Sequence, residues 1–218
     1  MSWKTGHRSF YYEGAPEPET PDLQPGKVAL LVIDVQNTYL EGDAPHWAPF
    51  RARMRETVIP NIAALIATFR ARGLDVLFAR IACLRDDGRD RSLSQRKPGW
   101  NNLLLPKDAA ASQIVPELAP RPGEIVVTKT TDSALTGTNL RLILTNLGIT
   151  HVVCAGIFTD QCVSSTVRSL ADESFDVIVL EDGCAAGTEA LHARELEVLN
   201  MIYCNVMSCA ELAALLPR

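Results

Sequence analysis

The chain lacks the features of proteins that bind nucleic acids or span membranes. Its 218 residues contain 21 Lys and Arg against 26 Asp and Glu, a net charge of −5. Nucleic acids and anionic membranes attract clustered positive charge, so we expect neither as a partner. No apolar run approaches the roughly 18 residues of a membrane span, and the first residues lack the apolar stretch of a signal peptide. We therefore expect a cytoplasmic protein that acts on a small molecule.

Phosphate-binding and redox motifs are also missing. The sequence has no GxGxxG after its first predicted strand and no GxxxxGK[ST], so dinucleotide and P-loop functions lack their phosphate cradle. None of the six cysteines forms a C-x-x-C pair. We expect reduced thiols rather than disulfides, and a redox thiol protein would lack a resolving partner for Cys162. There is no internal repeat.

What the sequence does contain is a regular alternation of strands and helices. VALLVI (28–33) is a continuous apolar run, as expected of a parallel strand buried on both faces. Further strands are predicted at 74–81, 124–128, 151–157, 176–181 and 203–207, with helices at about 56–72, 140–147, 163–170, 189–201 and from 209. The alternation predicts an α/β fold of three αβα layers, doubly wound around a six-stranded, mostly parallel sheet.

The predicted organisation is an arm followed by one domain. Residues 1–26 carry four prolines and are expected to lie over the surface, and residues 27–218 form the domain. Residues 82–123 separate the second and third strands, far more than the usual connection, so they are expected to form an insertion that serves as a lid or a subunit contact.

Three reactive side chains follow three predicted strands. Asp34 ends the first strand, Lys129 ends the third, and Cys162 follows the fourth in GIFTDQC. Each alone has a simple structural explanation: a turn cap, a solvent-exposed ammonium and a packed thiol. The carboxyl ends of parallel strands share one edge of a sheet, so all three can meet in one pocket. We then expect a helix N-terminus and Lys129 to lower the pKa of Cys162, with Asp34 as the base.

These residues stand in segments that resemble the isochorismatase-like cysteine hydrolases. The segments are LLVIDVQNTYL, VVTKTTDSALTGTNL and GIFTDQCVSSTVRSL, and the resemblance extends from about Gly26 to the C-terminus. The superfamily includes nicotinamidases, N-carbamoylsarcosine amidases, ureidoacrylate hydrolases, and biuret and triuret hydrolases.

The resemblance implies a role for each residue. Asp34 is the expected general base, Lys129 its charged partner and Cys162 the nucleophile. It also implies a cis peptide bond between Ile157 and Phe158, which lets the backbone N–H groups of Phe158 and Cys162 form an oxyanion hole. The implied activity is that of an amidohydrolase that works through a thioester.

The resemblance also bears on cofactors and substrate. Nicotinamidases of the superfamily bind a metal through a D-x-H element, which this sequence lacks, so we expect no metal and no cofactor. The run DVQNTY is similar to the ureidoacrylate-type members and favours a ureido or carbamoyl compound such as triuret, biuret or a ureido acid. The expected substrate-binding residues are Asn37, Tyr39, Trp100, Asn101 and Tyr203. Biuret hydrolases carry Gln where this sequence aligns Ile202, which disfavours biuret.

Several alternatives stay open. The enzyme could act on another small amide such as nicotinamide or N-carbamoylsarcosine, or the fold could be a binding module without activity. A dehalogenase-type phosphatase would need a second Asp at position 36, where Gln36 stands. Members of the superfamily are often dimers or tetramers, so a homo-oligomer is expected.

Overall fold

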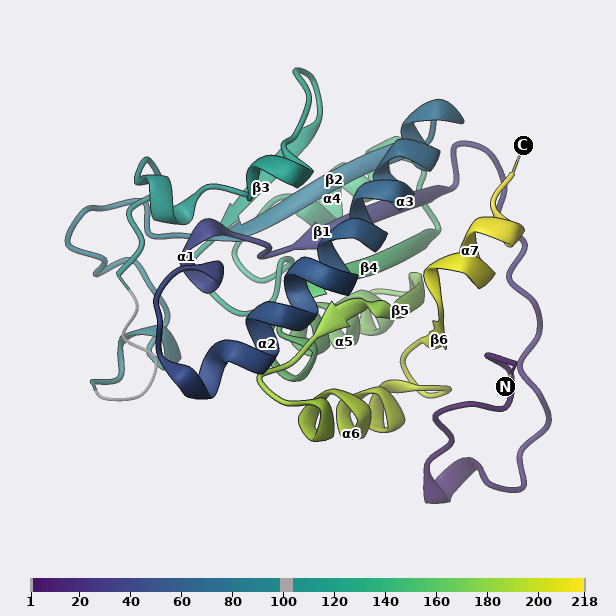
Figure 1. The fold of residues 1–218 in the computed structure, drawn as a ribbon. Helices are drawn as coiled ribbons and strands as arrows, with labels where there is room; N and C mark the ends of the chain where they lie inside the picture. The colour runs from purple at the N-terminus through teal and green to yellow at the C-terminus, as the bar shows by residue number, and fades with distance from the viewer. Residues whose placement is uncertain (1, 99–103, 218) are drawn as a thin grey trace.

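A six-stranded sheet forms the centre of the computed structural model, which describes residues 2–98 and 104–217 (Figure 1). The strand order is β3-β2-β1-β4-β5-β6, and every neighbouring pair is parallel. The strands are β1 (Val28–Ile33), β2 (Asp75–Ile81), β3 (Ile125–Lys129), β4 (His151–Ile157), β5 (Asp176–Ala185) and β6 (Asn205–Met207). The predicted doubly wound fold is confirmed. Its strand order reverses between β1 and β4, where ligands of such sheets bind.

Helices cover both faces of the sheet, and every residue of β1 is therefore buried. On one face, Val28, Leu30 and Val32 pack with the apolar residues of α3 and α7. On the other face, Ala29, Leu31 and Ile33 pack with those of α4, α5 and α6. The helices are α1 (Asn37–Leu40), α2 (Ala48–Arg53), α3 (Ile59–Ala71), α4 (Leu140–Leu147), α5 (Ser164–Asp172), α6 (Glu189–Leu199) and α7 (Cys209–Leu215).

Two elements extend well past their predicted bounds, whereas β6 is shorter than the predicted strand at 203–207. The helix predicted at 56–72 is the last part of a longer helical run in which α2 leads into α3 through a π-helical turn, Met54–Val58. The strand predicted at 176–181 continues to Ala185. In both cases the hydrogen-bonded element extends past the apolar pattern that predicted it.

The segment between β2 and β3 is fastened to the carboxyl edge of the sheet by Gln36. The Gln36 side chain is fully buried, and its Nε2 donates to the carbonyls of Ile81 (2.9 Å) and Ser112 (2.8 Å). Its Oε1 accepts from Ile81 N–H at 2.9 Å. In its described parts, residues 82–98 and 104–124, the segment forms 3₁₀ turns at Ser94–Arg96, Ala110–Ser112 and Pro116–Leu118. It is therefore placed beside the ends of β1 and β2.

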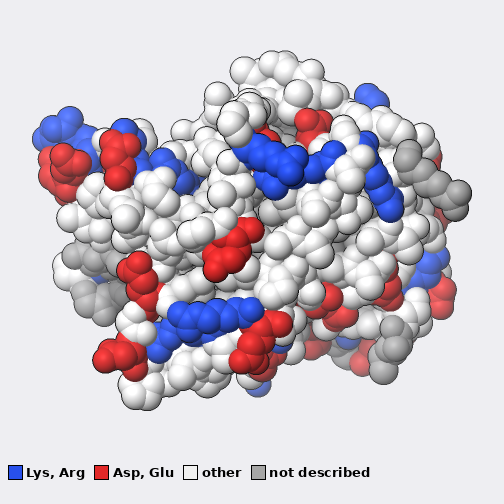
Figure 2. All heavy atoms as spheres, turned by 45° about the horizontal axis from the view of Figure 1, so that its top comes forward, with Lys and Arg blue, Asp and Glu red and all other residues white. Residues whose placement is uncertain are grey.

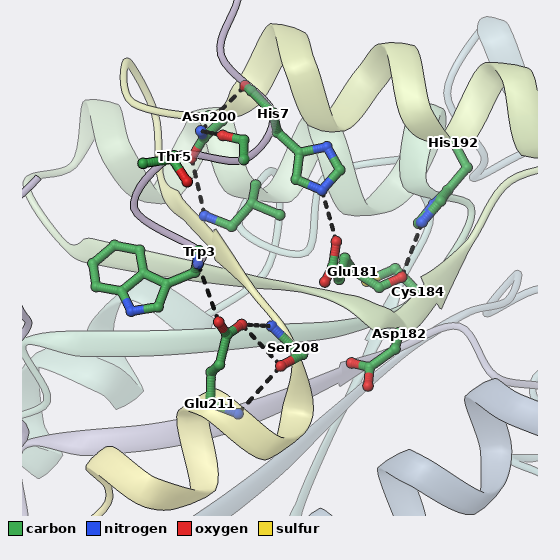
Figure 3. Close-up of polar contacts among 12 residues, drawn as sticks. Trp3, Thr5, His7, Glu181, Asp182, Cys184, His192, Asn200, Ser208 and Glu211 are labelled. Carbon is green, nitrogen blue, oxygen red and sulfur yellow. Dashed lines mark hydrogen bonds and ion pairs between the residues drawn. The ribbon is translucent and has the colours of Figure 1, made fainter. Parts of the chain in front are cut away.

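The N-terminal arm lies along the β5 and β6 side of the molecule (Figure 3). Trp3 N–H donates to Glu211 Oε1 at 3.1 Å, and Asn200 Nδ2 donates to the His7 carbonyl at 3.2 Å. His7 Nε2 lies 2.7 Å from Glu181 Oε2. The arm is thus held by polar contacts to β5, to α7 and to the end of α6, which all lie far from the arm in the sequence.

Figure 2 shows one face of the molecule, on which basic and acidic side chains are interspersed. Across residues 2–98 and 104–217, no helix has both the length and the apolar character that a membrane crossing requires.

Candidate active site

A buried ion pair joins the ends of β1 and β3. Lys129 Nζ lies 2.7 Å from Asp34 Oδ2, and both side chains are almost fully shielded from solvent. Lys129 Nζ also donates to the Thr131 carbonyl at 3.1 Å. Asp34 has a left-handed backbone (φ 54°), a conformation that Asp tolerates better than most residues. The strand ends therefore bring together two residues that lie 95 positions apart in the sequence, as predicted.

The segment that carries Cys162 depends on Gly156 in β4. Gly156 pairs with Ile33 of β1, and a Cβ on it would lie 2.0 Å from the Ile33 carbonyl oxygen, so only glycine fits. The peptide bond between Ile157 and Phe158 is cis, which confirms the prediction from the resemblance. The chain then forms a π-helical turn, Thr159–Val163, ahead of α5, and Cys162 lies within it.

The Cys162 thiol faces two carboxylates. Cys162 Sγ donates to Asp132 Oδ1 at 3.7 Å, and the thiol is close enough to Asp34 that, besides burial, the Asp34 charge raises the pKa of Cys162. The three predicted residues Asp34, Lys129 and Cys162 thus meet at the reversal point between β1 and β4.

The expectation that the Cys162 thiol has a lowered pKa is wrong. Burial raises the pKa of Cys162 well above its usual range, and the charge of Asp34 raises it further, while Lys129 opposes them without reversing the shift. The pattern of strand ends predicts Asp34 beside the thiol, but it does not include the burial of Cys162, which is the largest cause of the shift. In this environment the thiol holds its proton, so a base must remove it before the sulfur can attack.

Burial also raises the pKa of Asp34, and the Lys129 ammonium works against that shift. For Lys129, burial lowers the pKa, but Asp34 and Cys162 outweigh it and the net direction is upward. A carboxyl whose pKa rises toward neutral is a better proton acceptor than an ordinary aspartate. The pair therefore keeps a cation in place beside a carboxylate that is suited to proton transfer.

A cavity of about 860 Å³ lies over this site. Aromatic rings form part of its wall: Tyr39 and Phe158 meet edge to face at 5.3 Å, and the centroids of Trp47 and Phe158 are 5.7 Å apart. The complete lining is Thr38, Tyr39, Glu41, Trp47, Arg51, Asp132, Phe158, Asp160, Gln161, Ser164, Ser165 and Arg168. Cys162 is 6% exposed and is not itself a lining residue, but it lies in the chain between the lining residues Gln161 and Ser164. Its thiol contacts the lining residue Asp132, so the buried site is next to the cavity.

The predicted substrate-binding residues have different fates. Tyr39 lines the cavity, and burial followed by the charges of Asp34 and Cys162 raises its pKa, which places the ring close to the site. Asn37 does not line it: Asn37 Nδ2 donates to the Ala110 carbonyl at 2.9 Å, and the residue faces a neighbouring hollow. The substrate contact predicted for Asn37 is therefore not supported. Trp100 and Asn101 lie outside the described residues.

Tyr203 is at the opposite edge of the sheet. It lies just before β6 and lines a hollow with Phe175 and Asn205, near the amino ends of β5 and β6. Its ring packs against the Arg168 guanidinium at 4.5 Å. Arg168 lines the cavity over the site but Tyr203 does not, so the substrate contact predicted for Tyr203 is not supported. Ile202 shares that hollow and is exposed, so its identity does not argue against biuret.

Two contributors near the thiol were missed. Asp132 lines the cavity, and Gln95 Nε2 donates to Asp132 Oδ1. Gln95 belongs to the long segment between β2 and β3, where no periodic pattern indicates which side chains turn inward. Asp132 stands in KTTDSAL, three residues after Lys129, and its nearness to that lysine was the one signal available.

A buried histidine supports the segment that carries Cys162. His192 Nε2 of α6 lies 2.9 Å from the Glu181 carbonyl (Figure 3). On the other side of the ring, His192 Nδ1 lies 2.8 Å from Thr159 Oγ1. Burial lowers the pKa of His192 to about 4, and the Arg53 charge adds to the shift. His192 is therefore neutral at pH 7 and holds the start of the π-helical turn against β5.

The described residues include no group of three or more His, Cys, Asp or Glu side chains placed to hold a metal ion.

This fold and this arrangement of strand ends define an isochorismatase-type hydrolase. The isochorismatase domain model matches residues 28–211, and the chain belongs to the isochorismatase family. The family assignment agrees with the resemblance seen in the three sequence segments.

Individual relatives sharpen the assignment. The chain is 34% identical over 182 residues to the ureidoacrylate amidohydrolase RutB of Pantoea ananatis. The aligned region covers 77% of this chain and 73% of that protein. Among solved structures it is similar to an isochorismatase-like hydrolase from Alkaliphilus metalliredigens, with a TM-score of 0.70, 30% identity and coverage of 86% and 98%. It is also similar to the N-carbamoylsarcosine amidase of Thermoplasma acidophilum, with a TM-score of 0.68, 26% identity and coverage of 84% and 96%.

Proposed function

We propose that the protein is a cysteine-dependent amidohydrolase that cleaves a C–N bond of a small ureido or carbamoyl compound through a thioester. The observation that carries the proposal is the buried Asp34–Lys129 pair, which lies close enough to the Cys162 thiol to shift its pKa, next to a cavity that Asp132 and Phe158 line. Such a set supplies a base, a charge partner and a nucleophile at one point. The similarity to a ureidoacrylate amidohydrolase supports the choice of substrate class.

The first half of the reaction forms the thioester. Asp34 takes the proton of the Cys162 thiol, and the thiolate attacks the carbonyl carbon. The backbone N–H groups of Phe158 and Cys162 stabilise the oxyanion. Asp34 then gives its proton to the leaving nitrogen as the C–N bond breaks, so ammonia or an amine departs and the acyl group stays on sulfur.

The second half returns the enzyme to its starting state. Asp34 takes a proton from water, whose oxygen attacks the thioester carbonyl, and the C–S bond breaks. The proton returns to the Cys162 sulfur, and the acid is released. Lys129 stays protonated and holds the Asp34 carboxylate in place throughout.

The enzyme is proposed to need no metal, because its residues supply base, nucleophile and oxyanion donors. It is proposed to act as a homo-oligomer in the cytoplasm. Elemental analysis of the active protein tests the first point, since stoichiometric zinc or iron would refute it. Light scattering and cell fractionation test the others, with a monomer or a membrane-bound pool as the contrary results.

Ammonia release across a substrate panel tests the proposed activity. The panel contains biuret, triuret, ureidoacrylate, N-carbamoyl amino acids and nicotinamide, with Cys162→Ser as the blank. We expect release from at least one ureide and none with the blank. A Cys162→Ser protein that turns over as fast as wild type would contradict the proposal.

An amidase acting on N-carbamoylsarcosine is a second candidate, supported by the similarity to the Thermoplasma enzyme. The substrates of the two candidates differ at one nitrogen. In N-carbamoylsarcosine this nitrogen carries a methyl group, whereas in most ureides it carries a hydrogen. The same panel separates them.

A further inference from the structure

Asp132 provides a second carboxylate beside the nucleophile. Its Oδ1 lies 3.7 Å from Cys162 Sγ, and besides burial the charge of Asp34 acts on the same thiol by raising its pKa. Asp132 is partly exposed and lines the cavity, and Asp34 is 1% exposed. The proposed mechanism uses only Asp34, so Asp132 has no role in it.

The position of Asp132 is fixed from the segment between β2 and β3. Gln95, 5% exposed, donates from Nε2 to Asp132 Oδ1. Within the described chain both side-chain contacts of Asp132 use Oδ1, which leaves Oδ2 as an acceptor for a ligand in the cavity. A buried amide therefore orients a carboxylate toward the place where a substrate must lie.

The geometry of attack restricts which substrate atom meets Asp132. A carbon about to be attacked lies about 3–3.5 Å from the nucleophile, so atoms bonded to it come within hydrogen-bond reach of a carboxylate that touches the sulfur. The carbon carries three groups: the oxygen that becomes the oxyanion, the leaving nitrogen and the group that is retained. The oxygen faces the N–H donors, and Asp34 serves the leaving nitrogen. The retained group is left for Asp132.

We propose that Asp132 is a specificity-determining residue that accepts a hydrogen bond from an N–H on the retained side of the scissile carbonyl. In a ureide the retained atom is nitrogen, whereas in a simple carboxamide it is carbon. A carboxylate without its hydrogen-bond partner disfavours binding of the carboxamide. The inference rests on the proposed function and narrows it to ureides that keep an N–H, which excludes N-carbamoylsarcosine as a good substrate.

Gln95 is a positioning residue in the same account. It does not line the cavity over the thiol, and it acts through Asp132. The segment between β2 and β3 thereby contributes to substrate choice. A purely structural role for Gln95 predicts equal losses on all substrates, whereas a positioning role predicts a change in selectivity.

Matched substrate pairs test the inference. Biuret and malonamide differ only by NH in place of CH₂, and N-carbamoylglycine and N-carbamoylsarcosine differ only by an N-methyl group. We expect wild type to prefer the N–H member of each pair in kcat/KM. For a member too slow to assay, its inhibition constant against the faster one replaces kcat/KM.

Asp132→Asn is the central variant because it keeps the size of the side chain. We expect kcat/KM on the N–H substrates to fall by about 10- to 100-fold, because a hydrogen bond to a charged acceptor is lost. On the other member of each pair, kcat/KM should fall by less than about 3-fold. Asp108→Asn, an exposed carboxylate in the same segment as Gln95, is the control and should keep the preference. An equal fall in kcat/KM on both members of a pair would show that Asp132 acts on the thiol instead. An Asp132→Asn protein with wild-type kcat/KM on both members would also overturn the inference.

Gln95→Ala should reduce the preference by about 3- to 10-fold, less than Asp132→Asn, because the carboxylate remains but loses its anchor. Equal losses on both members would refute the positioning role. The failure of the proposed function looks different: wild type would then release no ammonia from any ureide, which overturns both. Ureide turnover without preference overturns only the role of Asp132.

Discussion

Two ion pairs of this protein have the same length and opposite settings. Lys129 Nζ and Asp34 Oδ2 are 2.7 Å apart at the buried carboxyl edge of the sheet, and Arg70 Nη2 and Glu124 Oε2 are 2.7 Å apart between α3 and the start of β3. Each of the Arg70 and Glu124 side chains keeps more than a tenth of its surface in solvent. The distance between two charged groups therefore does not show which ion pair takes part in the reaction.

The partly exposed Arg70–Glu124 pair has several hydrogen bonds. Arg70 donates to both oxygens of Glu124, from Nε at 2.8 Å and from Nη2 at 2.7 Å, and Glu124 Oε2 also accepts from Arg121 N–H. The buried pair has one short contact and no access to water. Taking two charges out of water is expensive, and a buried pair often stabilises a fold less than apolar residues would. The Asp34–Lys129 pair is therefore explained by the reaction rather than by stability.

Asp34→Asn should have the largest effect. It removes the base and leaves the Lys129 charge buried without its partner, so kcat/KM should fall by about 10²–10⁴-fold and the free energy of unfolding by about 3–5 kcal/mol. Urea unfolding and ammonia release measure the two effects. The control is Asp176→Asn, whose side chain is 79% exposed, and it should change neither. An Asp34→Asn protein with wild-type turnover would remove Asp34 from the mechanism.

The double variant Asp34→Asn plus Lys129→Met removes both charges of the buried pair. Asn tolerates the left-handed backbone at position 34. We expect the free energy of unfolding to recover to within about 1 kcal/mol of wild type or to exceed it, while activity stays lost. If the double variant is as unstable as the two single losses added together, the buried pair does stabilise the fold, and the contrast with Arg70–Glu124 fails.

His192 extends the comparison to a buried group that is neutral. Its pKa of about 4 is below that of a histidine in the unfolded chain, about 6.5, so the unfolded state binds the proton first as pH falls. The stabilising contribution is complete above about pH 6.5 and decreases by about 3 kcal/mol on going to pH 4. His192→Gln should flatten the pH dependence of the free energy of unfolding in that window. His46→Gln is the control, and an identical slope in His192→Gln and wild type would contradict this account.

Glu124→Gln should have the smallest effect. The variant keeps hydrogen-bonding atoms at the partly exposed pair, so we expect a loss of about 1 kcal/mol in the free energy of unfolding. Ammonia release should be unchanged, because the pair is outside the cavity lining. A fall in kcat/KM comparable with that of Asp34→Asn would mean that the two pairs do not differ in function.

The sequence predicted the fold and the three central residues because both depend on strongly patterned features. Runs such as VALLVI mark strands buried on both faces, and the rule that parallel strands end at one edge brings Asp34, Lys129 and Cys162 together. The same rule would have excluded Tyr203, which precedes its strand instead of following it. The roles of Gln95 and Asp132 depend on how an aperiodic segment folds back, and the raised pKa of Cys162 depends on burial, so neither could be predicted from residue order.

Turnover by Cys162→Ala is the decisive measurement, because Cys162 Sγ is the protein atom that is proposed to form a covalent bond with the substrate. The account predicts that ammonia release from the ureide substrate falls to the level of a reaction without enzyme, while the variant keeps the wild-type unfolding midpoint to within a few degrees. Near wild-type release by Cys162→Ala would contradict the account, whatever the geometry of Asp34 and Lys129.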